Sequence, residues 1–417
     1  MSSTRPVGIE ALHAYCGRTS MDIPTLFRHR GLDPDRMANL RMAAKSVALH
    51  CEDAVSFAVN AARPLVEALT EEERATIELV VVGTESGVDF GKSVTSYVHH
   101  YLGLPRTCRL FEVKQACYSA TAALQMAANT VAASPHEDAR ALVISSDVAL
   151  PVPHSYIEPS QGAGAVALLV GARPTLAELD RGANGFHSYE VMDTCRPTPG
   201  TETGDTDLSL LTYLDCLQGA FADYASRTRD VDIVETFDLL AMHTPFPGMV
   251  RGAHRTLLRR LRRMAPPEIE EDFTRRLAPS LHYPSQVGNI YGGTVLLALA
   301  SAISHTELTG EARVGVFSYG SGCSSEFFSC VVSPESHRAA RESGLDRALD
   351  NRHRLSPEEY DALLSAAGRF PFGTADLDVD LDLFPHLTKP AAGAGPLLVL
   401  ESVRGYHRRY VWIGGDR

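Results

Sequence analysis

Long hydrophobic runs are absent from the sequence: none approaches the roughly 18 to 20 apolar residues that a membrane-spanning helix needs. Residues 1–6 are polar and lead directly into Val-Gly-Ile at 7–9, a pattern unlike a secretory signal. The 417-residue chain has a formal net charge of −12, which argues against nucleic acid as its main partner. These absences predict a cytoplasmic protein that binds neither membrane nor nucleic acid.

Paired cysteines are also lacking. The eight cysteines are scattered, form no CxxC pair and show no metal-ligand spacing, so we expect reduced thiols and no metal site. Lysine is scarce, occurring only at positions 45, 92, 114 and 389. The chain otherwise has an ordinary globular composition, with 44% hydrophobic and 22% charged residues.

Short β-branched runs that end in Gly or Ser alternate with stretches rich in Ala, Leu and Met. The expected strands are 77–83, 141–145, 165–171, 238–242 and 314–318, and the expected helices are 121–133, 256–264 and 294–303. This alternation predicts an α/β architecture with mixed or parallel sheets. We expect residues 186–208 to be rich in loops and residues 336–383 to form a charged, helical excursion on the surface.

Cys117 lies where an apolar segment becomes an Ala-rich helix. A thiol at a helix N-terminus meets the positive end of the helix dipole, which favours the thiolate, and nearby backbone N–H groups can stabilise an oxyanion. A buried structural cysteine is the alternative interpretation.

Three further polar residues each follow a predicted strand or begin a helix. His243 directly follows a strand, Glu85 follows another, and Asn289 precedes an apolar helix. Taken singly, each has a structural explanation, as a core histidine, a helix-start charge and an N-cap. Taken together with Cys117, they provide a nucleophile, carbonyl-polarising groups and a carboxylate base, the groups that a Claisen-type acyl transfer needs.

The segments that carry these residues resemble the 3-hydroxy-3-methylglutaryl-CoA synthase family. The matching motifs appear in the family's order and span most of the chain: Gly-Thr-Glu-Ser-Gly-Val-Asp at 83–89, Lys-Gln-Ala-Cys-Tyr at 114–118, Gln-Gly-Ala-Gly-Ala-Val at 161–166, His-Thr-Pro-Phe at 243–246, Gly-Asn-Ile-Tyr at 288–291 and Phe-Ser-Tyr-Gly-Ser-Gly at 317–322. The resemblance implies the thiolase fold, five αβαβα layers built as two related halves, here residues 1–172 and 173–417, and a homodimer.

The resemblance also implies roles for the four residues above, of which Glu85 and Cys117 lie in the first half and His243 and Asn289 in the second. Cys117 would be acetylated, and Glu85 would remove a proton from the acetyl methyl group. His243 would bind or protonate the β-keto oxygen of the acceptor, with Asn289 assisting.

Four other residues match supporting positions of the family. Asp147 and Asp193 match acidic positions, whereas Tyr319 and the backbone around Ser321 would line the acyl pocket. Hydrolysis of the enzyme thioester would release the product, without a metal or redox cofactor.

Within the family, the sequence is most similar to the branch found in polyketide pathways, on the evidence of segments 7–12, 190–197, 248–255 and 406–413. The lysine-bearing stretch that holds coenzyme A phosphates in primary-metabolism enzymes is replaced here by Pro-Gly-Met-Val-Arg at 247–251. The resemblance therefore implies an acyltransferase that adds an acetyl or propionyl carbanion from a donor acyl carrier protein to a β-ketone on an acceptor carrier protein, both substrates being held on phosphopantetheine.

Three alternatives remain at this level. A primary-metabolism synthase would use acetyl-CoA and acetoacetyl-CoA, and the missing lysine disfavours it. An initiation-type ketoacyl synthase has no need of a proton-abstracting Glu85. A scaffold that only binds carrier proteins would not need the intact catalytic residues.

A basic segment at 251–263 stands out on an acidic chain. Carrier proteins are acidic, so a helix presenting Arg251, Arg255, Arg259 and Arg260 is a candidate docking surface. A solvated helix face is the alternative interpretation.

Overall fold

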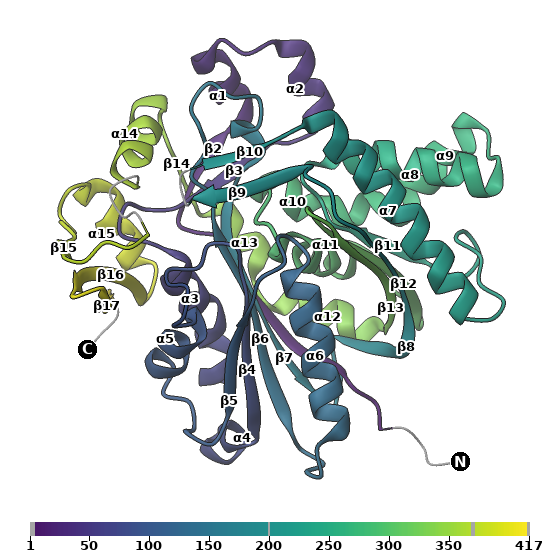
Figure 1. The fold of residues 1–417 in the computed structure, drawn as a ribbon, viewed down its shortest axis with the longest axis horizontal. Coiled ribbons are helices and arrows are strands. Elements are labelled where there is room, and N and C mark those ends of the chain that lie inside the picture. The colour runs from purple at the N-terminus through teal and green to yellow at the C-terminus, as the bar shows by residue number, and fades with distance from the viewer. Residues whose placement is uncertain (1–4, 199–200, 368–371, 415–417) are drawn as a thin grey trace.

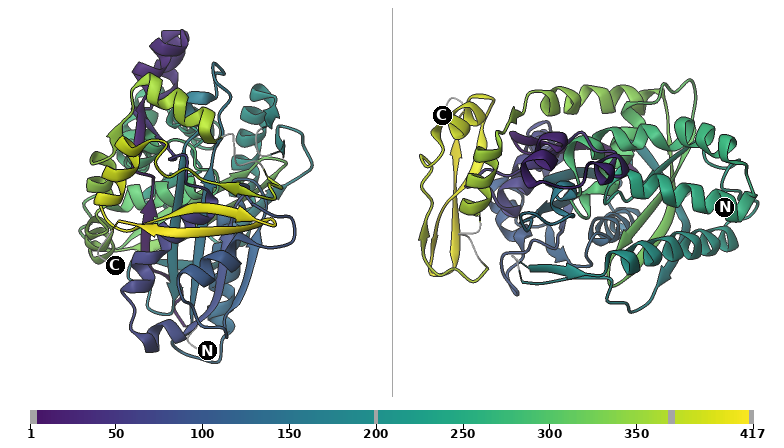
Figure 2. Two further views of the ribbon diagram at one scale, coloured as in Figure 1. Left: turned by 90° about the vertical axis from the view of Figure 1, so that its left-hand side faces the viewer. Right: turned by 90° about the horizontal axis from the view of Figure 1, so that it is seen from above.

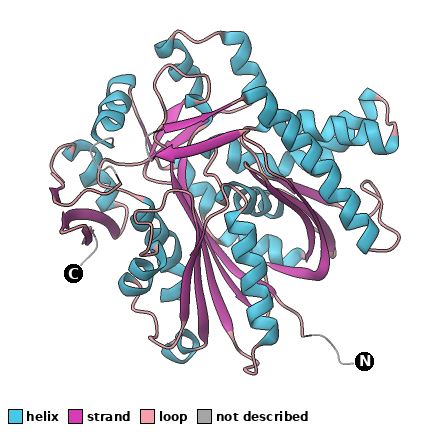
Figure 3. Ribbon diagram, viewed as in Figure 1, coloured by secondary structure: helices cyan, strands magenta, loops and turns pink. Residues whose placement is uncertain are grey.

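The computed structural model describes residues 5–198, 201–367 and 372–414. Its largest sheet has the strand order β11-β12-β13-β8-β1-β7-β6-β4-β5, and Figures 1 and 3 show it running through the centre of the molecule. The strands are β1 (Gly8–Tyr15), β4 (Ile77–Gly83), β5 (Arg109–Val113), β6 (Arg140–Val148), β7 (Ala163–Gly171), β8 (Ala177–Ser188), β11 (Leu239–Met242), β12 (Ala312–Gly320) and β13 (Ser324–Val332).

This sheet consists of two wings that meet at a short seam. Between β1 and β8 only two residue pairs are in register, Gly8 with Glu178 and Ile9 with Ala177. The N-terminal wing contains β1, β7, β6, β4 and β5, and the C-terminal wing contains β8, β13, β12 and β11. Each wing mixes parallel and antiparallel pairs.

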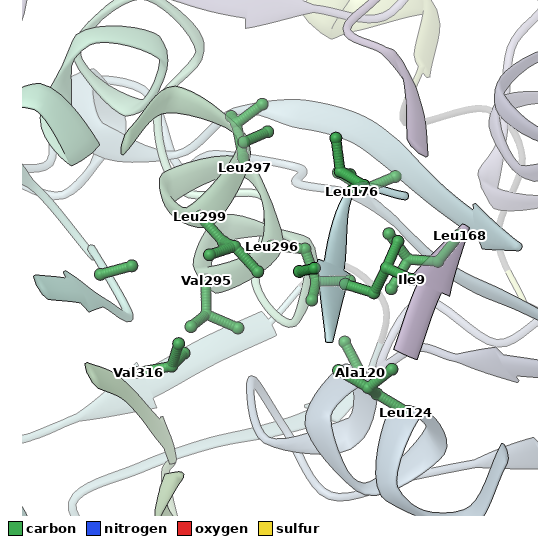
Figure 4. Packing of buried hydrophobic residues seen from close by; sticks show 14 of the residues in the cluster. Ile9, Ala120, Leu124, Leu168, Leu176, Val295, Leu296, Leu297, Leu299 and Val316 are labelled. Carbon is green, nitrogen blue, oxygen red and sulfur yellow. The ribbon is translucent and has the colours of Figure 1, made fainter. Parts of the chain in front are cut away.

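Two helices fill the space between the wings and form the central layer. These are α6 (Ser119–Ala133) and α11 (Gly293–Ser304), whose apolar side chains share one core with strands of both wings. Every residue of α11 is buried, as expected for a helix that is apolar all round. Small residues on α6, such as Ala120, allow close packing, and Figure 4 shows Ala120 and Leu124 near Ile9 and Val295 near Val316.

Outer helices cover the far face of each wing. Helices α3 (Ala54–Glu67) and α5 (Val94–Tyr101) pack on the N-terminal wing, and α7 (Thr206–Arg227) and α8 (Pro247–Arg262) pack on the C-terminal wing. Figure 1 shows these two pairs on opposite sides of the molecule. The five αβαβα layers that the resemblance implied are therefore present.

The remaining elements surround this framework. Of these, β16 (Leu397–Arg404) and β17 (His407–Ile413) pack against α3 (Figure 2). There the side-chain amide of Asn60 donates to Leu398 O at 3.1 Å and accepts from Leu398 N at 2.8 Å. The remaining elements are β2 (Thr19–Asp22), α1 (Ile23–Arg30), α2 (Pro34–Leu40), β3 (Ala44–Val47), α4 (Glu71–Ala75), a 3₁₀ turn (Glu158–Ser160), β9 (Thr194–Thr198), β10 (Thr201–Gly204), α9 (Pro266–Asp272), a π turn (Phe273–Leu277), a 3₁₀ turn (Ala278–Leu281), α10 (His282–Val287), α12 (Pro334–Glu342), α13 (Leu345–Asp350), β14 (His353–Arg354), α14 (Pro357–Ala367), β15 (Leu377–Asp378), α15 (Pro385–Gly393), β16 (Leu397–Arg404) and β17 (His407–Ile413).

All five predicted strands and all three predicted helices are present; β4 has the predicted ends, and each of the other elements is shifted at one end or both. The prediction for 256–264 captured only the second half of α8, which begins at Pro247, a residue well suited to a first helical turn. The prediction of a loop-rich stretch at 186–208 is wrong in part. β9 and β10 pair there as a hairpin, of which residues 199–200 lie outside the described residues.

The region 336–383 contains α12, α13, β14, α14 and β15, and residues 368–371 lie outside the described part of the chain. Tyr360 of α14 is fully buried and accepts a 3.1 Å hydrogen bond from Lys45, so this region also packs against the core. The division into domains at residue 172, and the status of this region as an excursion, stay predictions.

No helix among the residues that the structure describes is long and apolar enough to span a membrane.

Candidate active site

The carboxyl ends of three parallel strands place Glu85, Cys117 and Asp147 together. β4 pairs in parallel with both β5 and β6, so the segments that follow these strands meet at one edge of the sheet. Glu85 lies two residues beyond β4, Asp147 lies near the end of β6, and Cys117 lies between β5 and α6. The Sγ atom of Cys117 lies 3.6 Å from Oε1 of Glu85.

The segment between β5 and α6, residues 114–118, carries Cys117 and is called the nucleophile loop here. It is held by close backbone packing on two sides. An ideal Cβ on Gly83 would lie 2.7 Å from the carbonyl carbon of Ser119, and one on Gly320 would lie 2.6 Å from Gln115 O. Only glycine fits at these positions. Ala116 has a left-handed φ of 43°, which turns the chain just before Cys117. The end of β12 therefore lies directly against the nucleophile loop.

Asp147 positions Glu85 and also acts on it electrostatically. Its Oδ1 accepts hydrogen bonds from the backbone N–H of Glu85 at 2.9 Å and from the hydroxyl of Thr84 at 3.0 Å. Burial, and then the charge of Asp147, raise the pKa of Glu85 to about 8. Burial also raises the pKa of Asp147, to about 6. At neutral pH Glu85 is therefore largely protonated, and it becomes a base at slightly alkaline pH.

The expected thiolate at Cys117 is not what the site favours. Burial, together with the charges of Glu85, Asp147 and Glu202, raises the pKa of the thiol well above its ordinary value. The start of α6 is close to Cys117, but desolvation and three neighbouring carboxyl groups outweigh a helix-dipole effect of about 0.3–1 kcal/mol. Cys117 is therefore a thiol at neutral pH, and as a nucleophile it would have to lose its proton during the reaction.

His243 follows β11 and is almost completely buried, with 1% of its surface exposed. Its backbone N–H donates to Phe317 O at 2.8 Å, which joins it to β12, and its carbonyl accepts from the hydroxyl of Tyr213 at 2.8 Å. Burial lowers the pKa of its imidazole to about 3, so the ring is neutral. No described residue hydrogen-bonds its Nδ1. A neutral, rigidly held imidazole suits hydrogen bonding to a substrate oxygen.

Asn289 is oriented by the turn that precedes α11. Its side-chain oxygen accepts from the backbone N–H of Tyr291 at 3.0 Å and from the hydroxyl of Thr294 at 3.1 Å. Tyr291 in turn packs with Cys117 and Ala149 in a small buried cluster. Because both bonds engage the oxygen, the amide nitrogen of Asn289 is left to donate to another group.

Asp193 ties the end of β12 to the turn before β9. It is fully buried and accepts one hydrogen bond from the hydroxyl of Tyr319 and another from the backbone N–H of Gly322, the latter at 2.9 Å. Ser321 is half-buried in the turn between β12 and β13. The acyl-pocket roles of Tyr319 and Ser321 stay predictions.

Two charged residues of the β9–β10 hairpin enter the site and were not assigned from the sequence. Glu202 accepts from the hydroxyl of Tyr291 at 2.9 Å and from Gln161 at 2.7 Å. Arg196 donates to the hydroxyl of Ser86 at 3.2 Å and lies 5.7 Å above the Tyr291 ring. Arg196 lies within segment 190–197, one of the segments that resemble the family, so the sequence offered a signal for it. Glu202 lies in no such segment, so the sequence offered no signal for its place in the site.

The predicted residues thus fall into directly bonded groups. Glu85, Cys117 and Asp147 form one, and Asp193 and Tyr319 form a second. Asn289 contacts the first group through Tyr291. His243 and Tyr319 lie at the same end of the adjacent strands β11 and β12. The arginines of α8 lie outside these groups, on the exposed face of an outer helix.

Two family models match the chain: the hydroxymethylglutaryl-coenzyme A synthase N-terminal model over residues 3–175 and the C-terminal model over residues 255–370. The chain is 47% identical over 416 residues to the polyketide biosynthesis 3-hydroxy-3-methylglutaryl-ACP synthase PksG of Bacillus subtilis (strain 168), covering 97% of this chain and 99% of that protein. It is 34% identical over 388 residues to the hydroxymethylglutaryl-CoA synthase of Enterococcus faecalis, covering 91% and 95%.

Solved structures of the same family also match this chain. The HMG synthase of the curacin biosynthetic pathway matches with a TM-score of 0.95 at 49% identity, covering 98% of this chain and 100% of that one. That enzyme has also been solved in complex with holo donor-ACP. The fold and the Cys117–Glu85 pair define a thiolase-fold condensing enzyme, an acyltransferase that forms carbon–carbon bonds. The chain belongs to the hydroxymethylglutaryl-coenzyme A synthase family.

Proposed function

We propose that this enzyme installs β-branches in polyketide biosynthesis. It condenses an acetyl or propionyl group, delivered by a donor acyl carrier protein, with the β-ketone of a polyketide on an acceptor carrier protein. The observation that carries the proposal is the 3.6 Å contact between the Cys117 thiol and Glu85, because it pairs an acyl acceptor with a base beside it. Substrates are held on phosphopantetheine, and no further cofactor is required.

The reaction begins with acyl transfer. Cys117 Sγ attacks the thioester carbonyl, the pantetheine thiol leaves, and the proton of Cys117 passes to the leaving sulfur. Glu85, in its ionised form, then takes a proton from the acyl carbon next to the thioester. This is the step for which a carboxylate with a pKa of about 8 is suited, because it is a stronger base than an ordinary glutamate.

Carbon–carbon bond formation follows. The new carbanion attacks the β-keto carbon of the acceptor, whose oxygen receives hydrogen bonds from the neutral His243 ring and the amide of Asn289. The proton that Glu85 took from the acyl carbon then passes to the alkoxide, which gives the tertiary alcohol and returns Glu85 to its ionised form. Water then hydrolyses the Cys117 thioester, which releases a carboxylate on the product and returns the thiol.

The comparisons favour carrier-bound over coenzyme A substrates. The 3-hydroxy-3-methylglutaryl-ACP synthase PksG and the curacin-pathway HMG synthase, which was also solved with donor-ACP, are 47% and 49% identical to this chain. The hydroxymethylglutaryl-CoA synthases of Enterococcus faecalis and Schizosaccharomyces pombe are 34% and 28% identical. The segment after His243, which lacks lysine, begins α8 directly and offers no ammonium group to a coenzyme A phosphate. The primary-metabolism alternative is therefore disfavoured.

The test is intact-mass analysis of the protein after incubation with an acetyl-loaded acyl carrier protein or with acetyl-CoA. We expect an acetyl adduct that forms faster from the carrier protein and is absent in Cys117→Ala. Faster labelling by acetyl-CoA would move the assignment to the primary-metabolism activity. No adduct from either donor would favour the non-catalytic scaffold.

Carrier-protein docking is proposed for the exposed face of α8. Arg255 and Arg259 are exposed one helical turn apart, and no ion pair engages either of them within the described ranges. Arg251 is partly neutralised by Glu270 at 2.6 Å, and Arg260 is held by Gln218 of α7. The helix begins four residues after His243 and rises about 18 Å to Arg259. A partner docked along it could therefore direct a flexible arm back to the site.

A homodimer is proposed through the edge of the N-terminal wing. Among the residues that the structure describes, strand β5 pairs with β4 alone, and four of its five residues are half-buried. A second copy could pair along this edge and cover it. Light scattering across micromolar concentrations should report twice the chain mass, and a monomer throughout would contradict this assembly.

A further inference from the structure

Two histidines and one aspartate from three separate elements meet outside the active site. His282 begins α10, His305 follows the last residue of α11, and Asp346 lies in α13. One side-chain donor atom from each lies within 4.8 Å of the other two. His282 is exposed and the other two are half-buried, so the cluster is open to solvent.

His305 is held so that one ring nitrogen faces this cluster. Its Nδ1 lies 2.9 Å from the carbonyl oxygen of Ser301, and so it must carry the proton in a neutral ring. Its Nε2 then presents a lone pair, 3.4 Å from Oδ1 of Asp346. A histidine that donates its other N–H to a backbone carbonyl is the usual arrangement of a metal ligand.

His282 adds a second imidazole, one of whose ring nitrogens lies in the cluster. Its ring centroid lies 4.1 Å from that of His305. Its Nε2 lies 2.9 Å from the side-chain amide nitrogen of Gln286, which donates to it, so this nitrogen also has a lone pair. A metal ion would take that lone pair in place of Gln286.

We propose that His282, His305 and Asp346 form a binding site for a divalent transition-metal ion, with zinc as the best match. Two imidazole nitrogens and one carboxylate oxygen suit zinc, nickel or copper, whereas magnesium and calcium prefer all-oxygen sites. Ligands about 2.0–2.1 Å from zinc in a tetrahedron lie about 3.4 Å apart. The His305–Asp346 separation of 3.4 Å already matches that spacing.

The ion would join three elements that the chain brings together from far apart. It would link the start of α10, the end of α11 and α13. Helix α10 leads directly through Gly288 to Asn289, and α11 follows that turn, so the site clamps both helices that flank this active-site turn. Three protein ligands leave a fourth position for water, the coordination of an open rather than a closed site.

The experiment uses the full chain without a histidine tag, stripped of metal with a chelator and then titrated with Zn²⁺ by calorimetry. We expect one strong site per chain, a melting temperature that rises with free Zn²⁺, and affinity at least about tenfold weaker in His282→Gln, His305→Gln and Asp346→Asn. His100→Gln, an exposed histidine on α5, is the matched control and should bind like the native chain.

Co²⁺ provides a second readout that does not depend on stability. The native protein should show visible d–d bands of a nitrogen- and oxygen-ligated ion, and Asp346→Asn should weaken them. A sulfur-to-cobalt charge-transfer band would place the ion at a cysteine and overturn the proposal. Equal zinc affinity in the native protein and all three cluster variants would overturn it as well, as would a native chain that binds no zinc. Acetylation of Cys117 is measured separately, so failure here leaves the proposed function untouched.

Discussion

At the scale of single residues, Cys117 and Glu85, the pair to which the proposed reaction assigns nucleophile and base, are both mainly protonated at neutral pH. A thiol with a strongly raised pKa and a glutamic acid with a pKa of about 8 lie 3.6 Å apart. The thiol gains no activation from these neighbours, so its acylation must rely on transfer of its proton during the reaction. The high pKa of Glu85 is an advantage in the proton abstraction that follows acyl transfer, because a buried carboxylate that has lost its proton is a strong base.

Replacing Glu85 by Gln should separate the two steps. The amide keeps the shape of the side chain but cannot accept the methyl proton, so we expect condensation to fall by roughly 10²- to 10⁴-fold while the acetyl adduct on Cys117 still forms. Intact mass reports the adduct, and product analysis reports condensation. Equal loss of both steps would show that Glu85 acts already in the acyl transfer.

The pH dependence of proton abstraction should follow the ionisation of Glu85. Because its raised pKa of about 8 keeps it protonated at lower pH, deuterium uptake by the acetyl methyl of the acylated enzyme should increase with pH, reach half its maximum near pH 8 and level off about one pH unit higher. Asp147→Asn removes a neighbouring negative charge that raises this pKa, so the rising limb should move to lower pH. Mass spectrometry in D₂O measures the uptake, and an unmoved limb would contradict the role of Asp147.

At the scale of elements, the site depends on contacts between backbones. The end of β12 lies so close to the nucleophile loop that an added Cβ on Gly320 would lie 2.6 Å from both Gln115 O and Tyr118 N. Gly320→Ala should therefore separate β12 from the loop. We expect a loss of about 1–3 kcal/mol in the free energy of unfolding and slower acetylation of Cys117. Urea denaturation and intact mass measure these two effects.

Gly252→Ala is the matched control for this substitution. Gly252 lies inside α8 with no atom within 4 Å of an added Cβ, so alanine should stabilise the helix by up to about 1 kcal/mol and leave acetylation unchanged. If Gly320→Ala behaved like this control, the nucleophile loop would be more adaptable than its packing indicates.

At the scale of the whole molecule, the sequence predicts those strands and site residues that have a local hydrophobic pattern or a local motif. The pattern of β4 predicts its observed ends, and the motifs around Glu85 and Cys117 single out two residues that the structure brings into contact. The β9–β10 hairpin was missed because its residues follow no hydrophobic period and are held by long-range bonds, such as Glu202 with Tyr291. The cluster of His282, His305 and Asp346 has no sequence signature for a related reason, since only tertiary packing brings these distant positions together.

Electrostatics also acts at the scale of the whole molecule. The net charge of the chain and the local charge on α8 have opposite effects on an approaching acidic carrier protein. The chain carries a net charge of −12, so an acidic carrier protein is repelled by the molecule as a whole and attracted only by a local basic surface such as the face of α8. Arg259 and Arg260 are exposed on that face. Changing both to Glu should remove the attraction and leave the repulsion, so kcat/KM with carrier-bound acetyl should fall at low salt.

The response to ionic strength should then change sign. Added salt screens whichever interaction dominates, with a Debye length of about 10 Å at 0.1 M. Turnover by the native enzyme should therefore decrease as salt increases, whereas turnover by Arg259→Glu/Arg260→Glu should increase. The control Arg338→Glu/Arg341→Glu makes the same charge change on exposed positions of α12, and it should keep the native salt response. If both double variants respond alike, net charge alone governs the encounter and α8 is a solvated helix face, because a docking surface must distinguish where on the molecule the charge is placed.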